Sequence, residues 1–544
     1  MSPPTAFRTP RPPLSRTSRP RRAGLPRRTA AVAVLLLGVL LLLMVVRLPW
    51  SGDLGMHAAV LERLRADLVH PGNPLVDEDT PSPYYSPWTV ALALVATATG
   101  WGTFGVLRLA GLAGLALLGT GLAAFTRTFS RARIAVPLAL LCVLLLYGVV
   151  PFAWSGMPGL ASLSLTLAYP GTFALGLSCW LWALLRRART AGWGLPGHVG
   201  LGFLLGSVLL VHQFTGVVAV LGVLAVLLGT RPGPGGAGWA RLAAGGAVAL
   251  VLPLCWPYYS FPALLGGGGL DPVHRALYGR AAERFCLVAV GVAALGARWW
   301  RDRRDPLALL FGLGTAVVAA GWVSGHYAWG RALPAVLIPA QLALAVETAE
   351  ALEGREAFED CEASKGRGSS KGCEAFKGHG AGGERLRRGL PVVAVAALLA
   401  GTWAQAGVLS YVLRREAVPP GLREAPVIAL WPRFGWAVAH VPKGATVMTN
   451  DYYALRTLPA YGPYTVAPAY PDLFLPDEKR RHDATRRYFA PATSRAERLG
   501  ILKEYGVTWV LQKNGAAGLA PGDPALRKAA QGPGGRVLLE VVGR

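Results

Sequence analysis

The chain has 544 residues, of which 53% are hydrophobic and 16% are charged, and its mean hydropathy is +0.39. This balance is too apolar for a soluble protein with an ordinary charged surface. Lys and Arg outnumber Asp and Glu by 55 to 30, but the basic residues cluster between apolar runs, so we interpret the net charge of +25 through the positive-inside rule and exclude nucleic acid as a partner.

Residues 1–29 are rich in Pro and Arg, which predicts a disordered basic tail in the cytoplasm. Residues 30–46 are apolar and no small-residue cleavage site follows them, so we expect an uncleaved first span. A helix crosses the hydrocarbon core, about 30 Å thick, with about 20 mostly apolar residues. Eleven candidate spans approach this length: residues 30–46, 104–126, 134–150, 169–185, 199–212, 214–229, 239–256, 285–299, 306–323, 332–346 and 390–413.

Basic clusters at the ends of these runs predict the orientation of the chain. All of them fall on the cytoplasmic side if residues 88–99 do not cross the bilayer and residues 199–229 form two helices broken near His212. We therefore expect a multi-pass plasma-membrane protein with a cytoplasmic N-terminus. The following segments would then lie together on the outer face: residues 48–88, 151–168, 257–283, 324–331 and 414–544.

Residues 347–389 form a low-complexity segment with a near-repeat that begins at Cys361 and again at Cys373. Such a composition is typical of a flexible cytoplasmic loop. These two cysteines and His379 match no common zinc spacing, and the remaining cysteines lie in or beside apolar runs. We assign them neither a metal site nor a disulfide.

Residues 414–544 differ from the rest of the chain, because strand-like runs alternate with helical stretches such as the one that begins at Ser494. This pattern predicts a small extracytoplasmic α/β domain. The expected strands are at residues 445–449, 507–512 and 537–542. The fold class is thus mainly α: a polytopic transmembrane helix bundle of about 11 spans, residues 30–413, followed by the C-terminal α/β domain.

The first outer loop, residues 48–88, holds the ionisable residues nearest to a predicted membrane exit. Asp53 stands where a carboxylate can accept the proton of a sugar or lipid hydroxyl. His57 lies one helical turn further on and would face the same hydroxyl, or a metal. The alternative is that Asp53 only caps the helix that carries His57. Residues 77–79, Asp-Glu-Asp, offer ligands for a divalent cation but are also typical of a solvated loop, which leaves any cofactor unknown.

Aromatic residues recur in the outer segments. We expect Tyr84, Tyr85, Tyr258 and Tyr259 either to bind a sugar or an isoprenoid, or to anchor the protein at the membrane interface. His212 stands between two apolar runs and is expected either to line a polar cavity or to bond to nearby backbone at a helix break.

This order of features resembles the GT-C superfamily of polytopic membrane glycosyltransferases, including protein mannosyltransferase-like and lipid A aminoarabinose transferase-like members. The likeness covers nearly the whole chain as a layout, although its motifs are short. The matching features are Gly52-Asp53 with His57, the Pro- and Tyr-rich residues 82–87, the His212-Gln213 break, Trp256-Pro257-Tyr258-Tyr259, residues 326–334 and residues 503–511. The bias to Ala, Gly, Arg and Pro is typical of a high-GC actinobacterium.

The resemblance implies a polyprenyl-phosphate sugar as donor and transfer, usually with inversion, to an envelope lipid, glycan or protein on the outer face. It implies that Asp53 is the base. Because a lipid phosphate would leave, positive charge is needed, and Arg331 with His326, beside Tyr327, is our first choice. Arg331 alternatively snorkels to ordinary headgroups.

Two departures from the family pattern leave the sugar open. Asp53 is followed by Leu54 and Gly55 instead of a second acid, and residues 82–87 read Ser-Pro-Tyr-Tyr-Ser-Pro where the family usually has His-Pro-Pro. Two other classes of function also fit many helices with polar residues between them: a transporter or flippase of lipid-linked intermediates, and a non-catalytic scaffold for envelope assembly.

Overall fold

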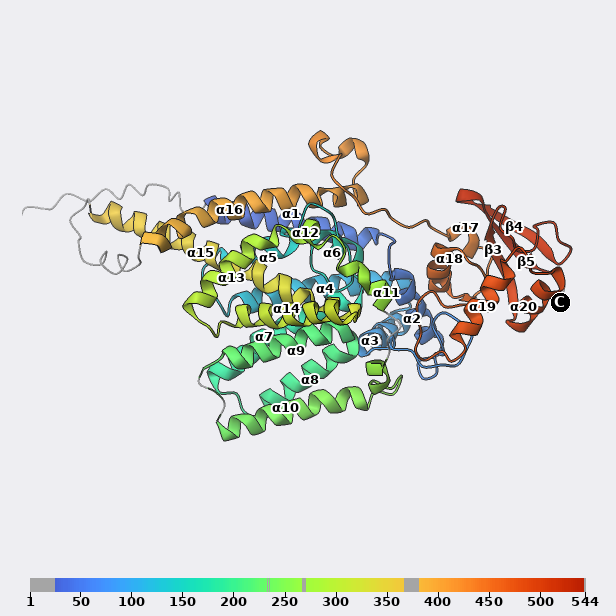
Figure 1. Cartoon of the computed structure of the whole chain (residues 1–544), viewed down its shortest axis with the longest axis horizontal. Helices are drawn as coiled ribbons and strands as arrows, with labels where there is room; N and C mark the ends of the chain where they lie inside the picture. Colours follow the sequence, from blue (N-terminus) through green and yellow to red (C-terminus); the bar gives the residue numbers. More distant parts are fainter. Residues whose placement is uncertain (1–24, 232, 234, 267–270, 366–380, 543–544) are drawn as a thin grey trace, which may run out of the picture.

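The computed structural model describes residues 25–231, 233, 235–266, 271–365 and 381–542 (Figure 1). Most of the predicted basic tail and all of His379 therefore lie outside the described residues. A long helical bundle occupies most of the molecule, and a smaller α/β unit lies at one end. The bundle contains α1 (Leu25–Arg47), α2 (Leu54–Ala66), α3 (Pro87–Thr99), α4 (Thr103–Thr126), α5 (Ala135–Leu145), α6 (Leu160–Thr166), α7 (Pro170–Ala191), α8 (Leu195–Val211), α9 (Gln213–Gly229), α10 (Gly236–Leu254), α11 (Asp271–His274), α12 (Ala281–Phe285), α13 (Val288–Arg301), α14 (Pro306–Ser324), α15 (Pro334–Lys365) and α16 (Ala381–Gln405).

Six helices of the described chain are long and apolar enough to cross a membrane by length and composition. They are Pro26–Arg47, Thr103–Thr126, Gly236–Leu254, Pro306–Ser324, Tyr327–Gly354 and Gly389–Tyr411. Tyr327–Gly354 lies almost wholly inside the bundle, with 89% of its apolar window buried. The other five keep large apolar side chains exposed, among them Leu36 at 64%, Leu250 at 65% and Leu399 at 67%, as expected for surfaces that face lipid. Four further apolar helices are shorter, so the predicted count of 11 spans stays a prediction.

The predicted break near His212 is confirmed, because this residue ends α8 and begins α9 with an extended backbone, φ −159° and ψ 101°. The predicted loop at residues 347–389 is wrong in extent. α15 continues to Lys365 and α16 begins at Ala381, because Ala and Glu dominate the first part of this segment and favour a helix. Residues 366–380 lie outside the described residues, as do the side chains of Cys361 and Cys373.

The α/β unit contains a five-stranded mixed sheet in the order β2-β1-β3-β5-β4. β1 pairs in parallel with β2 and β3, whereas β5 pairs antiparallel with β3 and β4. The three predicted strands are confirmed as β1, β3 and β5. The elements are α17 (Gly435–Val438), β1 (Thr446–Met448), α18 (Tyr452–Thr457), β2 (Tyr464–Thr465), α19 (Glu478–Tyr488), α20 (Arg495–Glu504), β3 (Val507–Lys513), β4 (Leu526–Gly532) and β5 (Arg536–Val541).

Successive side chains along the central strands point to opposite faces of the sheet, and both faces are buried. Val510 faces α19 and α20 in one apolar cluster, which also contains Val537 and Leu539. Its neighbours Trp509 and Leu511 face the opposite way, toward α17 and α18. The unit therefore has two apolar cores of its own, one on each face of the sheet.

The α/β unit is fixed to the bundle through α2 and the loop that follows it (Figure 1). Buried Arg63 of α2 donates to the carbonyl oxygens of Gly462 and Pro463, each at 2.8 Å, and lies 3.6 Å from the ring centroid of Tyr464. Gly55 lies so close to the unit that a Cβ at this position would be 1.8 Å from the carbonyl oxygen of Arg456. The contact leaves no room for a side chain.

Further along the loop, Asn73 donates to Asp472, and Arg481 binds Glu78. The backbone N–H of Thr465 donates to the carbonyl of Leu75 at 2.9 Å. These bonds connect the loop after α2 to residues almost 400 positions away. The unit is thus bound both to α2, which begins directly after Asp53, and to the loop that follows this helix.

Replacing Arg63 with Met is expected to lower the unfolding free energy by about 2–4 kcal/mol, because two buried carbonyls lose their donor. The melting temperature of the purified protein measures this effect. Lys443→Met is the matched control, since Lys443 is 72% exposed and its ion pair with Glu62 lies at the rim of the same contact. A surface pair contributes about 0–1 kcal/mol. Equal melting temperatures for the two variants would contradict the role given to Arg63.

Candidate active site

Asp53 is positioned by a turn between the first span and α2. Gly52 adopts φ +55°, a conformation that favours glycine, and a Cβ here would lie 3.2 Å from the hydroxyl of Tyr169. Asp53 occupies the N-cap position of α2, but its side chain makes no capping hydrogen bond. The alternative that Asp53 only caps the helix is therefore wrong in this structure.

The Asp53 carboxylate is half-buried and, within the described chain, accepts no hydrogen bond and forms no ion pair. It interacts electrostatically with five groups that are far apart or in different elements of the chain. These are His57, Tyr84, Tyr169, Arg331 and Tyr470. An unpaired carboxylate that faces a guanidinium and several phenols is suited to accept a proton from a ligand.

Arg331 reaches the same site from the 3-10 helix η4 (Tyr327–Ala332). Its guanidinium carbon lies 4.6 Å from the ring centroid of Phe214 and 5.9 Å from that of Trp154, so two aromatic rings constrain its plane. Nη2 lies 3.1 Å from Nε2 of His212. The other guanidinium nitrogens make no hydrogen bond within the described residues, which leaves one edge of the fork available for an anion.

Both ring nitrogens of His212 face hydrogen-bond donors. A guanidinium can only donate, so Nε2 of His212 accepts from Arg331 when the ring is neutral. Nδ1 caps α9 by accepting from the backbone N–H of Thr215 at 3.2 Å, and it lies 2.8 Å from Oγ1 of the same residue. The contact with Arg331 favours a proton on Nδ1, whereas the cap favours a proton on Nε2. His212 is therefore uncharged here, because a protonated ring would direct a second donor at Arg331.

His212→Ala is expected to weaken the binding of an anion at Arg331 about 10-fold, because Arg331 loses the group that orients it. His212→Gln is expected to stay within a few-fold of the wild type, since its side-chain oxygen can accept from Arg331. Titration of the purified protein with a lipid phosphate measures both variants. Equal affinities for the His212→Ala variant and the wild type would show that Arg331 needs no such support.

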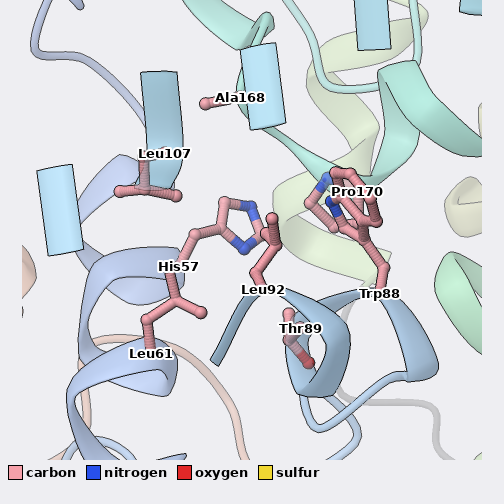
Figure 2. Close-up of a pocket in the computed structure, with 8 residues that line it drawn as sticks. All are labelled: His57, Leu61, Trp88, Thr89, Leu92, Leu107, Ala168 and Pro170. Atoms are coloured by element: carbon pink, nitrogen blue, oxygen red, sulfur yellow. The ribbon is translucent and has the colours of Figure 1, made fainter. Parts of the chain in front are cut away.

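His57 lies on the inner side of α2 with 6% of its surface exposed (Figure 2). Its ring points into a small cavity beside Trp88, Thr89 and Leu92, and its Nδ1 has no hydrogen-bond partner. The ring centroid lies 4.6 Å from that of Tyr169. Burial lowers the pKa of His57 to about 4, against the opposing effect of Asp53, so the imidazole is neutral at physiological pH.

The four predicted tyrosines differ in what their hydroxyls contact. The hydroxyls of Tyr85 and Tyr258 donate to the backbone oxygens of Gly72, at 2.7 Å, and Leu68, at 2.6 Å, so they hold the fold together. The hydroxyl of Tyr259 accepts from Gln213 at 3.4 Å. Tyr84 differs, because its hydroxyl makes no hydrogen bond within the described chain and it interacts with both Asp53 and Arg331.

The predicted pairing of His326 with Arg331 is not found. His326 is 61% exposed in its side chain, lies 3.7 Å from Asp271 and stacks on Trp329. Tyr327 packs against Tyr278 and Trp322, with centroid distances of 5.7 and 5.8 Å. The physical reason is the geometry of η4. A 3-10 helix has about three residues per turn, so residues five apart point in different directions: Arg331 points inward and His326 points outward. The histidine that contacts Arg331 is His212, and not His326.

The acidic run at residues 77–79 contributes to the contact with the α/β unit, since Glu78 binds Arg481. Within the described residues, no three His, Cys, Asp or Glu side chains lie close enough together to hold a metal ion.

Several residues of this site were not predicted: Tyr169, Tyr470, Trp154 and Phe214. Tyr169 immediately precedes Pro170 at the start of α7, where an aromatic residue looks like an interfacial anchor. Tyr470 lies in a loop of the α/β unit, and no periodic pattern identifies it. Only tertiary structure brings these four to Asp53 and Arg331.

No protein-family model and no curated protein sequence matches this chain. Solved structures do match. The crystal structure of ArnT from Cupriavidus metallidurans in the apo state superposes with a TM-score of 0.51 at 16% identity, and the match covers 95% of this chain and 98% of that chain. The cryo-EM structure of the arabinofuranosyltransferase AftD from Mycobacteria gives a TM-score of 0.53 at 16% identity, covering 95% of this chain and 40% of that chain.

A mutant of AftD gives a TM-score of 0.55 at 17% identity over 95% of this chain and 42% of that chain. The chain has the GT-C fold. GT-C proteins with this architecture are polytopic membrane proteins, which agrees with the long exposed apolar helices. The match spans nearly all of ArnT but about two fifths of AftD.

Proposed function

We propose that this chain transfers a sugar from a polyprenyl-phosphate donor to a hydroxyl of an envelope lipid, glycan or protein on the outer face of the plasma membrane. One observation carries the proposal. The unpaired carboxylate of Asp53 interacts electrostatically with the guanidinium of Arg331, one edge of which makes no hydrogen bond within the described residues, at the junction of the bundle and the α/β unit. The name of the structural neighbour AftD, an arabinofuranosyltransferase, supports a pentose as the group transferred, and a hexose is the alternative.

In this mechanism Asp53 accepts the proton of the acceptor hydroxyl. The acceptor oxygen then attacks the anomeric carbon, and the bond between that carbon and the phosphate oxygen breaks with inversion. The electron pair of the broken bond stays on the phosphate, whose growing negative charge the free edge of Arg331 stabilises. Tyr84 lies near both groups and can donate a hydrogen bond to the sugar between them.

The geometry of Arg331 favours this role over binding of ordinary headgroups. A snorkelling arginine extends to the membrane surface, whereas Arg331 is half-buried between Phe214 and Trp154 and bonded to His212. Fixed cations of this kind stabilise charge without rearrangement during the reaction.

The test uses the full-length protein in lipid nanodiscs with radiolabelled polyprenyl-phosphate arabinofuranose or mannose and membranes of the source organism as acceptor. Label in a product that no longer partitions with the donor lipid supports the proposal. A transporter would instead move the intact donor across the bilayer of a proteoliposome without transfer. That outcome, or a scaffold that neither transfers nor flips, would contradict the proposal.

A further inference from the structure

Residues 469–472 of the α/β unit reach the candidate base. Tyr470 packs into the same apolar cluster as Tyr84 and Tyr169, and so belongs to the wall around Asp53. The guanidinium of Arg456 lies 4.8 Å from the ring centroid of Tyr470 and donates to the carbonyl of Ala469 at 2.7 Å. Arg456 therefore holds both the ring of Tyr470 and the carbonyl of the residue before it in place.

The hydroxyl of Tyr470 is buried and, within the described chain, has no hydrogen-bond partner. By contrast, the neighbouring hydroxyl of Tyr169 donates to the carbonyl of Ser51 at 2.6 Å. A buried polar group without a partner is destabilising, and natural structures keep few of them. The ring of Tyr470 is held in place while its hydroxyl has no partner within the described chain. Such a hydroxyl is available to bond to a ligand.

Tyr470 acts as a donor in this environment. Burial and the nearby Asp53 carboxylate raise its pKa well above the ordinary value, so the hydroxyl keeps its proton throughout the physiological pH range. The hydroxyl can therefore donate a hydrogen bond to an acceptor atom of a ligand, such as a hydroxyl or ring oxygen of a sugar.

The proximity of Tyr470 to Asp53 indicates which substrate it faces. Tyr470 and Arg331 both interact with Asp53 and with Tyr84. In the proposed mechanism Asp53 takes the proton of the acceptor hydroxyl, so a hydrogen-bond donor beside Asp53 lies where the acceptor binds. With Arg331 assigned to the phosphate of the donor, Tyr470 is assigned to the acceptor.

We propose that Tyr470 donates a hydrogen bond to the acceptor, and that the α/β unit thereby forms one wall of the acceptor subsite. This inference rests on the proposed function, since it needs Asp53 to be the base. Tyr470 would then help to determine which acceptors bind. Its hydroxyl comes from the α/β unit and not from the helical bundle.

The test compares Tyr470→Phe with the matched control Tyr452→Phe. The ring of Tyr452 lies 3.8 Å from the same Arg456 guanidinium, but this residue is 55% exposed. Each variant loses one phenol oxygen and keeps the ring next to Arg456. Transfer from the radiolabelled donor is measured at varied amounts of acceptor membrane and, separately, at varied donor, with the melting temperature of each variant.

The expected result for Tyr470→Phe is a specificity constant for the acceptor about 10-fold lower, expressed mainly in KM, with the donor KM and the melting temperature unchanged or the latter slightly raised. Tyr452→Phe should match the wild type. Transfer by Tyr470→Phe equal to the wild type would overturn the inference, and so would a fall in melting temperature that accounts for the loss.

The two proposals fail in different ways. A wild type that transfers no sugar removes the proposed function, and the acceptor subsite with it. An active wild type, an inactive Asp53→Asn variant and a fully active Tyr470→Phe variant would remove only the role of Tyr470.

Discussion

Asp53→Asn is expected to reduce the rate of sugar transfer about 100- to 10,000-fold, the range typical for loss of a general base. The amide has the same shape but cannot accept the proton of the acceptor hydroxyl at neutral pH. The native carboxylate makes no hydrogen bond and no ion pair within the described chain, so the substitution removes no structural contact. The measurement is transfer from a radiolabelled polyprenyl-phosphate sugar by purified protein in nanodiscs.

The melting temperature of Asp53→Asn should equal that of the wild type, which separates a chemical effect from misfolding. Asp483→Asn is the matched control, because Asp483 is a half-buried aspartate of α19 whose only ion pair is with Arg486 within the described residues. It should transfer normally. Substantial transfer by a folded Asp53→Asn protein would exclude Asp53 as the base.

Arg331→Met is expected to reduce transfer about 100- to 1,000-fold, as for removal of one fixed group that stabilises transition-state charge. Arg331→Lys should fall between this variant and the wild type, because an ammonium keeps the charge but cannot bond to His212 and hold a phosphate in two-point contact at once. The effect should appear mainly in kcat if the charge develops in the transition state.

The control for Arg331 is Arg275→Met. Arg275 also lies over an aromatic ring, 5.6 Å from the centroid of Tyr327, in a neighbouring loop. This variant should transfer within a few-fold of the wild type. If Arg331→Met and Arg275→Met lost activity equally, the effect would reflect the general positive charge of this end of the protein and not a specific phosphate contact.

The sequence allowed local and pattern-based features to be predicted well. The break at His212 followed from a polar residue between two apolar runs, and β1, β3 and β5 followed from short apolar runs between turns. Asp53 could be proposed as a candidate because a carboxylate directly after a span is costly unless it has a use. Its role as the base stays a prediction.

The remaining parts of the site depend on tertiary contacts. His326 was placed beside Arg331 because the two are close in sequence, but the turn of η4 separates their side chains and His212, 119 residues earlier, bonds to Arg331 instead. Tyr470 comes from the α/β unit, whose position is fixed by contacts such as those of Arg63. Spacing along the chain does not encode these distances. The length of α15 was missed because low-complexity sequence with a high content of Ala and Glu is also good helix-forming sequence.

The most direct test of the account is a cryo-EM structure of the protein in nanodiscs with a polyprenyl phosphate. We predict phosphate density within about 3 Å of the free guanidinium nitrogens of Arg331, with the lipid chain leading toward the bilayer and open space between the phosphate and Asp53. Phosphate bound at the opposite end of the bundle, or with Asp53 on the far side of a closed wall from it, would contradict the shared site.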